Sequence, residues 1–263
     1  MARSFVLLLI LLATGFAAGV EPSQGKLLII GGGSIGPAIW KELARLAGGF
    51  DAPLVYVPTA SENEPKPDAA EFLRKAGFTH VTTLHTRDPK KANEEGFVAP
   101  LKSARIVFFG GGRQWRIVDS YAGTETEKAF LDVLKRGGVV AGTSAGASIQ
   151  ASYLVRGARE NNFVMMAPAY EKGFGYLPGT AIDQHLLKRN RANDLWQVIG
   201  RHPELLGIGI DESTAISVEG GRFTVLGESL VAIYDAARRH ENPRHYFLSP
   251  GTVFDLALRK PLP

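Results

Sequence analysis

The sequence contains no cysteine among its 263 residues. Disulfide bonds, thiolate-bound metal sites and a cysteine nucleophile are therefore excluded. A lipoprotein anchor is excluded as well, because its acyl chain needs a cysteine. Any nucleophilic chemistry must use another side chain.

Blocks of one charge sign are also missing. The chain has 30 Lys and Arg residues against 26 Asp and Glu residues, a formal net charge of +4. The basic residues are interleaved with acids and form no stripe, which is not the pattern of a nucleic-acid-binding surface. We therefore expect no nucleic acid partner.

The N-terminus carries an apolar run that is too short to be a comfortable membrane span. It covers residues 5–13, follows the basic Arg3 and precedes the small residues Ala17, Ala18 and Gly19. This layout is typical of a secretory signal peptide cleaved after Ala18 or Gly19. The sequence predicts a signal peptide over residues 1–19, one domain over residues 20–263, and a secreted or periplasmic protein with no membrane attachment after cleavage.

Buried strands alternate with helical segments over the first part of the chain. Apolar strand-like runs lie at residues 26–30, 53–58, 80–86, 104–109 and 139–143, and helical periodicity lies at residues 37–49, 71–78, 113–123, 124–138 and 186–205. This alternation predicts an α/β fold, a single doubly wound domain whose mostly parallel sheet is flanked by helices. Two strands joined at Gly220-Gly221 and a further one after them are expected to extend the same sheet.

The first glycine cluster, Gly31 to Gly36, fits the spacing G-x-G-x-x-G after a strand and before a helix. A dinucleotide fingerprint must be considered for this spacing. However, the second strand ends in Pro58-Thr59, where an acid that binds ribose should stand. We favour a tight turn at the carboxyl edge of the sheet.

The second glycine cluster, Gly142-Thr143-Ser144-Ala145-Gly146, matches the nucleophile elbow G-x-S-x-G. A serine on a sharp strand-to-helix turn needs small neighbours, since the strand and helix approach closely. The Ala145 N–H and an N–H from residues 110–112 are natural donors to an oxyanion. The alternative is a glycine-rich loop that serves only packing or phosphate binding.

A serine nucleophile needs a base, and His185 is the best placed of the six histidines. It lies in "GTAIDQHLLKRNR", where an apolar strand end delivers Asp183, Gln184 and His185 together. The alternative for this segment is a helix capped by Asp183, with the arginines in solvent.

Four separated motifs together resemble the cyanophycinase family of serine peptidases, which includes the aspartyl dipeptidases called peptidase E. They are "FFGGGRQW", "GTSAGAS", "LPGTAIDQHLLKRNR" and "GIGIDESTAI", in the order of the family, and the resemblance covers about residues 26–262. It implies a fold similar to flavodoxin and class I glutamine amidotransferases, with a serine in place of their cysteine.

The resemblance also implies roles for individual residues. Ser144 matches the nucleophile and His185 the base, and the acid expected some fifteen to eighteen residues after the serine is Glu160. Gly112 and Ala145 would hold the oxyanion through their N–H groups. The substrate pocket would be lined by Gln114, Asp183, Gln184 and Arg191, with Arg189 a weaker match. No metal or other cofactor is implied, and the family suggests a homodimer.

The implied substrate is a peptide, either cyanophycin (multi-L-arginyl-poly-L-aspartate) or a related β-aspartyl or aspartyl peptide. An arginine fork suits the carboxylate of such a substrate. One departure concerns the family's "GGDQ" pattern, which reads Arg113-Gln114 here after the glycines. An acid there could favour the arginine side chains of cyanophycin, so Arg113 would alter the preference if it faces the pocket.

Two other functions stay open at the level of the sequence. An α/β-hydrolase esterase would use Ser144 with a late acid and histidine, which selects Asp235 with His240 or His245. A non-catalytic periplasmic protein would use the glycine loops to bind a small ligand.

Overall fold

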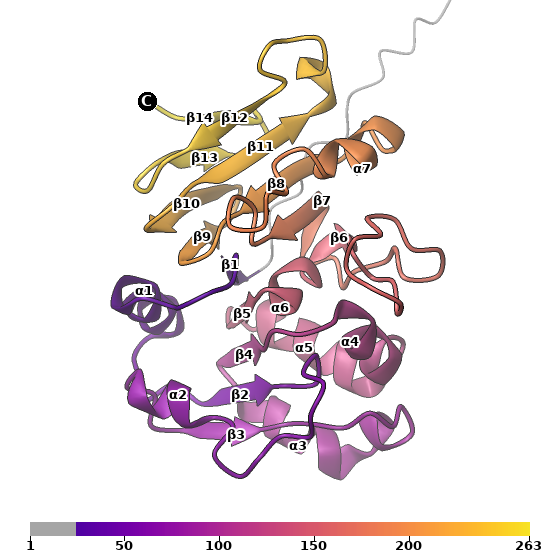
Figure 1. Cartoon of the computed structure of the whole chain (residues 1–263). Coiled ribbons are helices and arrows are strands. Elements are labelled where there is room, and N and C mark those ends of the chain that lie inside the picture. Colours follow the sequence, from indigo (N-terminus) through magenta and orange to yellow (C-terminus); the bar gives the residue numbers. More distant parts are fainter. Residues whose placement is uncertain (1–24) are drawn as a thin grey trace, which may run out of the picture.

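The computed structural model describes residues 25–263, so the predicted signal peptide lies outside the described part of the chain. The first half follows the alternation of strands and helices that the sequence predicts (Figure 1). Its strands are β1 (Lys26–Ile30), β2 (Leu54–Val57), β3 (Val81–Thr83), β4 (Ile106–Phe109) and β5 (Val139–Thr143). Its helices are α1 (Pro37–Ala47), α2 (Glu71–Lys75), η1 (Lys91–Asn93), α3 (Glu95–Ser103), α4 (Gln114–Tyr121), α5 (Glu125–Lys135) and α6 (Ala145–Ser148).

A nine-stranded sheet runs through the molecule in the order β14-β13-β10-β9-β1-β5-β4-β2-β3. The five strands from β1 to β3 are parallel to one another, as predicted. The other four strands are antiparallel and come from the C-terminal third: β9 (Thr214–Glu219), β10 (Arg222–Gly227), β13 (Val253–Asp255) and β14 (Lys260–Pro261). The predicted hairpin at Gly220-Gly221 joins β9 to β10.

A second sheet, of five strands, has the order β12-β11-β8-β7-β6. Its strands are β6 (Ala151–Tyr153), β7 (Leu177–Gln184), β8 (Leu206–Ile210), β11 (Val231–Asp235) and β12 (His245–Leu248). The predicted α/β class is confirmed, but the C-terminal third extends the first sheet only in part. The chain changes sheets between β8 and β9, in the short turn of residues 211–213.

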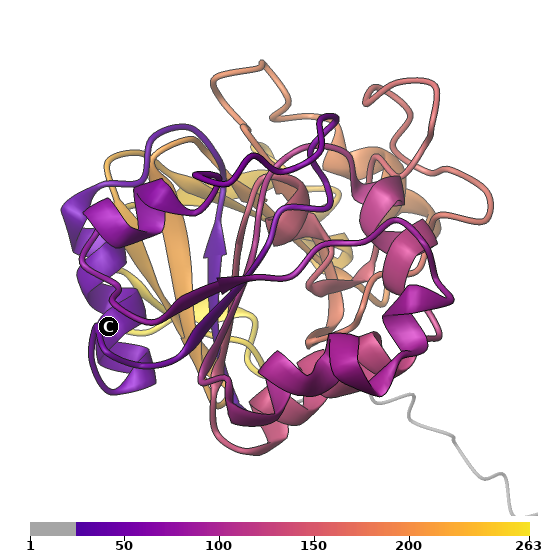
Figure 2. The same ribbon diagram turned by 90° about the horizontal axis from the view of Figure 1, so that it is seen from below.

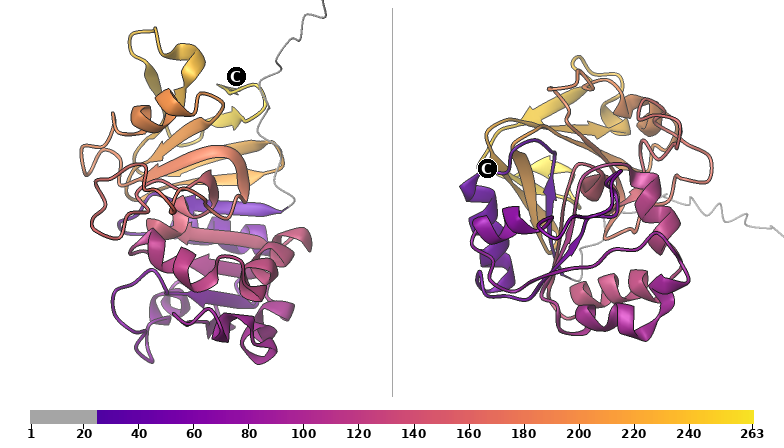
Figure 3. Two further views of the ribbon diagram at one scale, coloured as in Figure 1. Left: turned by 90° about the vertical axis from the view of Figure 1, so that its right-hand side faces the viewer. Right: turned by 60° about the horizontal axis from the view of Figure 1, so that its bottom comes forward.

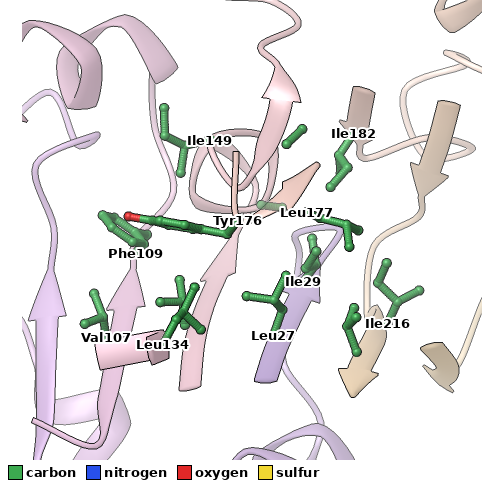
Figure 4. Close-up of a cluster of buried hydrophobic side chains, with 14 of the residues drawn as sticks. Leu27, Ile29, Val107, Phe109, Leu134, Ile149, Tyr176, Leu177, Ile182 and Ile216 are labelled. Atoms are coloured by element: carbon green, nitrogen blue, oxygen red, sulfur yellow. The ribbon is translucent and has the colours of Figure 1, made fainter. Parts of the chain in front are cut away.

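Side chains of the first sheet alternate between two separate hydrophobic clusters. In β1, Leu28 and Ile30 pack with the buried faces of α1 and α2. Leu27 and Ile29 point to the other side, where Phe109 and residues of α3 to α6 join them (Figure 4). This period of two is that of a strand buried on both faces. Helices accordingly lie on both sides of the first sheet (Figures 2 and 3).

The second sheet is also covered on both faces. Ile182, Ile208 and Ile233 belong to the large cluster shared with the first sheet, on the side opposite α1. Ala181 and Ala232 point the other way and pack with Val198 of α7 (Leu195–Arg201). Within residues 25–263, no helix is both long and apolar enough to cross a membrane.

The helix predicted over residues 186–205 is much shorter than its pattern indicates, because it begins only at Leu195. Residues 186–194 form turns instead, and the Asp211 carboxylate accepts hydrogen bonds from the N–H groups of Leu187 and Lys188. Asp183 belongs to strand β7, so it is not the cap of a helix. The chain switches from strand to turn at His185, whose φ is +53°.

Close backbone approach explains the glycines around the turn from β5 to α6. A Cβ atom on Gly142 would lie 2.2 Å from the carbonyl oxygen of Gly146, and one on Gly146 would lie 2.3 Å from that of Phe109. Both distances are far below van der Waals contact with rigid backbone. The small residues of the G-x-S-x-G motif therefore let α6 pack directly on β4 and β5.

We predict that Gly146→Ala lowers the free energy of unfolding by about 2–3 kcal/mol, as expected when a packed site is overfilled. The matched control is Gly96→Ala in α3, where a Cβ atom meets nothing within 4 Å. That control should change stability by less than about 1 kcal/mol. Urea unfolding of both variants checks this, and equal stabilities of the two would contradict the packing argument.

Candidate active site

Ser144 lies directly after β5, at the carboxyl edge of the parallel strands, where ligands bind in open α/β sheets. Its backbone has φ +55° and ψ −113°, a region that residues with a side chain rarely occupy. Its N–H donates to the carbonyl of Ile30 at 3.0 Å, which fixes the turn to the end of β1. The side chain is partly exposed. This is the strained, accessible position that a nucleophile elbow requires.

His185 follows β7 of the second sheet and reaches Ser144 across the junction of the two sheets. Its Nε2 lies 2.9 Å from Ser144 Oγ. The backbone N–H of His185 donates to the carbonyl of Gly31 at 2.8 Å. A Cβ atom on Gly32 would lie 2.3 Å from Cε1 of the imidazole ring. The first glycine cluster thus makes room for the His185 side chain, and the structure supports a turn lining a site over a nucleotide fingerprint.

Glu212 holds the other side of the imidazole ring. Its Oε1 lies 2.5 Å from His185 Nδ1. Because an ionised carboxylate can only accept, Nδ1 carries the proton and Nε2 is left to accept the hydrogen of the Ser144 hydroxyl. Glu212 stands in the turn between β8 and β9, and a Cβ atom on Gly33 would lie 2.8 Å from its Cβ. Serine, histidine and glutamate form one hydrogen-bonded chain.

Glu160, the acid expected from the resemblance, does not occupy the position beside His185. It is exposed on the loop between β6 and β7, near Arg113. The expectation counted residues after Ser144, whereas the carboxylate beside His185 comes from Glu212, in the turn between β8 and β9. A usable signal was present, since "GIGIDEST" places Asp211 and Glu212 at the end of an apolar strand, on the same edge as the other strand ends.

Burial lowers the pKa of His185 from its usual value of 6.5. The hydrogen bond to Glu212 raises it, and the positive charges of Arg189 and Arg191 lower it. The sum favours the neutral imidazole, which is the form that can accept a proton from Ser144. Below its lowered pKa the ring becomes protonated and loses this ability.

The two expected oxyanion donors lie near Ser144. Ala145 begins α6, and the first N–H groups of a helix have no partner within it. A Cβ atom on Gly111 would lie 3.3 Å from Ser144 Cβ, so the peptide of Gly111 and Gly112 passes beside the serine. Within residues 25–263, the Gly112 N–H has no hydrogen-bond partner. Both groups can therefore donate to a developing negative charge.

The residues expected to line the pocket are all in this neighbourhood but differ in exposure. Gln184 is buried, and its Oε1 accepts from Arg191 Nη1 at 3.1 Å. Asp183 has no exposed surface, and Arg156 binds both of its carboxylate oxygens. Asp183 can thus affect a ligand only through its neighbours. Arg189 is exposed and lies near enough to His185 to influence its pKa.

Gln114 and Arg113 both reach the loop between β6 and β7. The Gln114 side chain is buried and donates to the carbonyl of Val155, and Arg113 Nη2 donates to that of Ala158 at 2.5 Å. Burial, together with the nearby Arg116, lowers the pKa of Arg113. Arg113 therefore holds a positive charge at the start of α4, bound to this loop.

The late histidines do not form an alternative site with Ser144. His245 Nδ1 accepts from Trp196 Nε1 at 3.2 Å in the second sheet, and His240 is exposed beside Arg239. Asp235 accepts from Arg259. The esterase arrangement thus has no geometric support. Among the described residues, no group of three or more His, Asp or Glu side chains is arranged to hold a metal ion.

Comparisons with known proteins match this chain to a family. The sequence model of Peptidase family S51 matches residues 27–226. A cyanophycinase from Nostoc sp. is 31% identical over 257 residues, which cover 90% of this chain and 83% of that protein. A cyanophycinase from Synechococcus elongatus is 32% identical over 229 residues, covering 81% and 68% of the two chains.

Solved structures agree at the level of the fold. The crystal structure of a peptidase from an acI-B1 actinobacterium matches with a TM-score of 0.69 and covers 91% of this chain and 100% of its own. The two sequences are only 21% identical, so the similarity concerns the fold.

We predict that NMR titration of the His185 ring gives a pKa below 6.5. In Glu212→Gln the pKa should fall further, because the amide lacks the negative charge that stabilises the imidazolium. In Glu160→Gln, the matched control, it should not change. Equal shifts in the two variants would contradict the assignment of Glu212 to this ring.

Proposed function

This chain belongs to Peptidase family S51 and is a serine-type peptidase, and we propose that it cleaves aspartyl peptides through Ser144, His185 and Glu212. The observation that supports this most is the continuous chain of hydrogen bonds from Ser144 Oγ to His185 and from His185 to Glu212. The proposed substrates are cyanophycin or related β-aspartyl and aspartyl peptides, attacked at a chain end.

In the first step, His185 Nε2 accepts the proton of Ser144 while Oγ attacks the carbonyl carbon of the substrate. Glu212 keeps the proton on Nδ1 and stabilises the imidazolium that forms. His185 then passes the proton from Nε2 to the leaving amine, and an acyl-enzyme on Ser144 results. In the second step, water loses a proton to His185 and attacks the ester, which releases the acid and restores Ser144.

The negative charge on the tetrahedral oxygen needs donors that are already in place. We assign this role to the N–H groups of Ala145 and Gly112. Such donors lower a barrier by about 3 kcal/mol each where they have been removed singly in other enzymes. The fixed backbone supports the assignment, because neither group has to reorganise during the reaction.

An excess of positive charge beside the catalytic serine supports an acidic substrate. Arg189 and Arg191 follow His185 closely, and Arg191 is buried next to Gln184. We propose that Arg191 binds the free carboxylate of an aspartyl residue, for which a guanidinium is suited. Since Arg113 adds a further positive charge, short acidic peptides should be better substrates than the arginine-rich polymer.

We further propose that the protein is secreted or periplasmic, in agreement with the signal-like sequence of residues 1–19. A homodimer is proposed on the family resemblance alone. Edman sequencing of the mature protein and its sedimentation behaviour test these two points separately.

The direct test is hydrolysis of α- and β-aspartyl dipeptides and of cyanophycin, with the products identified by mass spectrometry. The wild type should release aspartate or β-aspartyl-arginine, and Ser144→Ala should reduce kcat by about 10⁶-fold. Undiminished hydrolysis by the alanine variant would exclude Ser144 as the nucleophile. Cleavage of none of these substrates would exclude the proposed specificity.

We expect Glu212→Gln to lower kcat by about 10³–10⁴-fold, the size of loss seen when the carboxylate of such a triad becomes an amide. Glu160→Gln removes a charge from the exposed loop and should leave kcat within about threefold of the wild type. Steady-state kinetics on the best dipeptide check both values. A larger loss of kcat in Glu160→Gln than in Glu212→Gln would instead assign the role of the acid to Glu160.

A further inference from the structure

We propose that Arg156 keeps Arg191 available for the substrate by occupying the carboxylate of Asp183. Arg156 is then a positioning residue that never touches the substrate. The inference rests on the proposed function, in which Arg191 binds the carboxylate of the substrate. It concerns a residue outside the motifs that point to the active site.

Arg156 is fully enclosed, and its guanidinium donates four hydrogen bonds. Only 1% of its side chain is exposed, and its backbone is in the left-handed region at φ +58°, an unfavourable state for a residue with a side chain. Its Nε and Nη2 each lie 2.8 Å from one oxygen of Asp183. Nη2 also donates to Asp194 at 2.7 Å, and Nη1 to the carbonyl of Asn162 at 2.7 Å. This many bonds fix the guanidinium in one place.

Asp183 has two basic neighbours at unequal distances. Its Oδ1 lies 2.8 Å from Arg156 Nε but 3.9 Å from Arg191 Nη1. The same Oδ1 accepts from the N–H of Gln184 at 2.9 Å. The two hydrogen bonds to Arg156 therefore hold the carboxylate in a long ion pair with Arg191, beyond hydrogen-bonding distance.

Arg191 is consequently a cation whose contact with Asp183 is long, at 3.9 Å, and lacks a hydrogen bond. Its Nη1 donates to the carbonyl and to Oε1 of Gln184, both at 3.1 Å, which orients the guanidinium without neutralising it. Within residues 25–263, the side-chain hydrogen bonds of Arg191 come from Nη1 alone, and 6% of the side chain is exposed. The pKa of Arg191 is lowered to about 10, mainly by burial and secondly by the positive charge of Arg156. A carboxylate arriving from the substrate would relieve this unfavourable environment.

Without the two hydrogen bonds from Arg156, the Asp183 carboxylate would be free to move toward Arg191. A shift of about one ångström suffices to turn the long ion pair into a direct hydrogen bond. The substrate's carboxylate would then compete with an internal one that is always present. Binding of acidic substrates should weaken, while the chemistry at Ser144 should be affected little, because Ser144, His185 and Glu212 make no bond to Arg156.

The first variant is Arg156→Lys, which keeps the charge but cannot bind both oxygens of Asp183. The substrates are a β-aspartyl dipeptide and the same dipeptide with its free α-carboxylate converted to a carboxamide. We expect KM for the acid to rise about tenfold, with kcat within about threefold and little change for the amide. An unchanged KM for the acid, or equal losses on both substrates, would overturn the proposal.

The second variant is the double substitution Arg156→Met with Asp183→Asn, which removes both buried charges and guards against loss of folding. With the competing carboxylate gone, KM for the acid should return to within about threefold of the wild type. A KM as high as that of Arg156→Lys would show that competition by Asp183 is not the cause. Urea unfolding confirms that each variant is folded.

A binding measurement separates failure of this inference from failure of the proposed function. Calorimetric titration of the Ser144→Ala protein with L-aspartate needs no turnover. Its dissociation constant should rise about tenfold when Arg156→Lys is added, and it should return to within about threefold when Arg156→Met and Asp183→Asn are added instead. If no peptide is cleaved but this pattern appears, the inference stands without the activity. Equal dissociation constants in all three proteins would overturn it even in an active peptidase.

Discussion

The imidazole of His185 packs so closely on the backbone at Gly32 that a single methyl group there would displace it. This contact joins the carboxyl edges of the two sheets. Gly31 accepts the N–H of His185, Ser144 donates to Ile30, and Ser213 donates to Gly32. The end of β1 thus serves as a common support for serine, histidine and the turn that holds the glutamate. The glycines after β1 create the space in which Ser144, His185 and Glu212 meet.

The site therefore depends on backbone positions that no single sheet could provide. Ser144 follows a strand of the first sheet, His185 a strand of the second, and Glu212 the turn where the chain passes from one to the other. Ser144, His185 and Ser213 all have φ near +55°. Buried contacts on both faces of each sheet stabilise these unfavourable conformations, which prealign the hydrogen-bonded chain before any substrate arrives.

The sequence was informative where the signal is local. Periodicity located the first five strands and most helices of the first half, and G-x-S-x-G located Ser144, because close packing restricts the neighbours of a nucleophile elbow. Glu212 was missed because its position depends on how the second sheet sits against the first. The long helix expected after His185 does not form, because Asp211 holds residues 187 and 188 in a turn. Arg156 gives no local signal at all, since its partners are distant in sequence.

We propose that an aspartyl carboxylate bound to Arg191 brings the scissile peptide bond of the substrate to Ser144. The most direct measurement is a crystal structure of the Ser144→Ala variant with a β-aspartyl dipeptide. We expect the free carboxylate to lie within hydrogen-bonding distance of the Arg191 guanidinium, and the scissile carbon to lie about 3–3.5 Å from the position of the missing hydroxyl. A dipeptide whose carboxylate binds elsewhere, with its peptide bond away from residue 144, would contradict it.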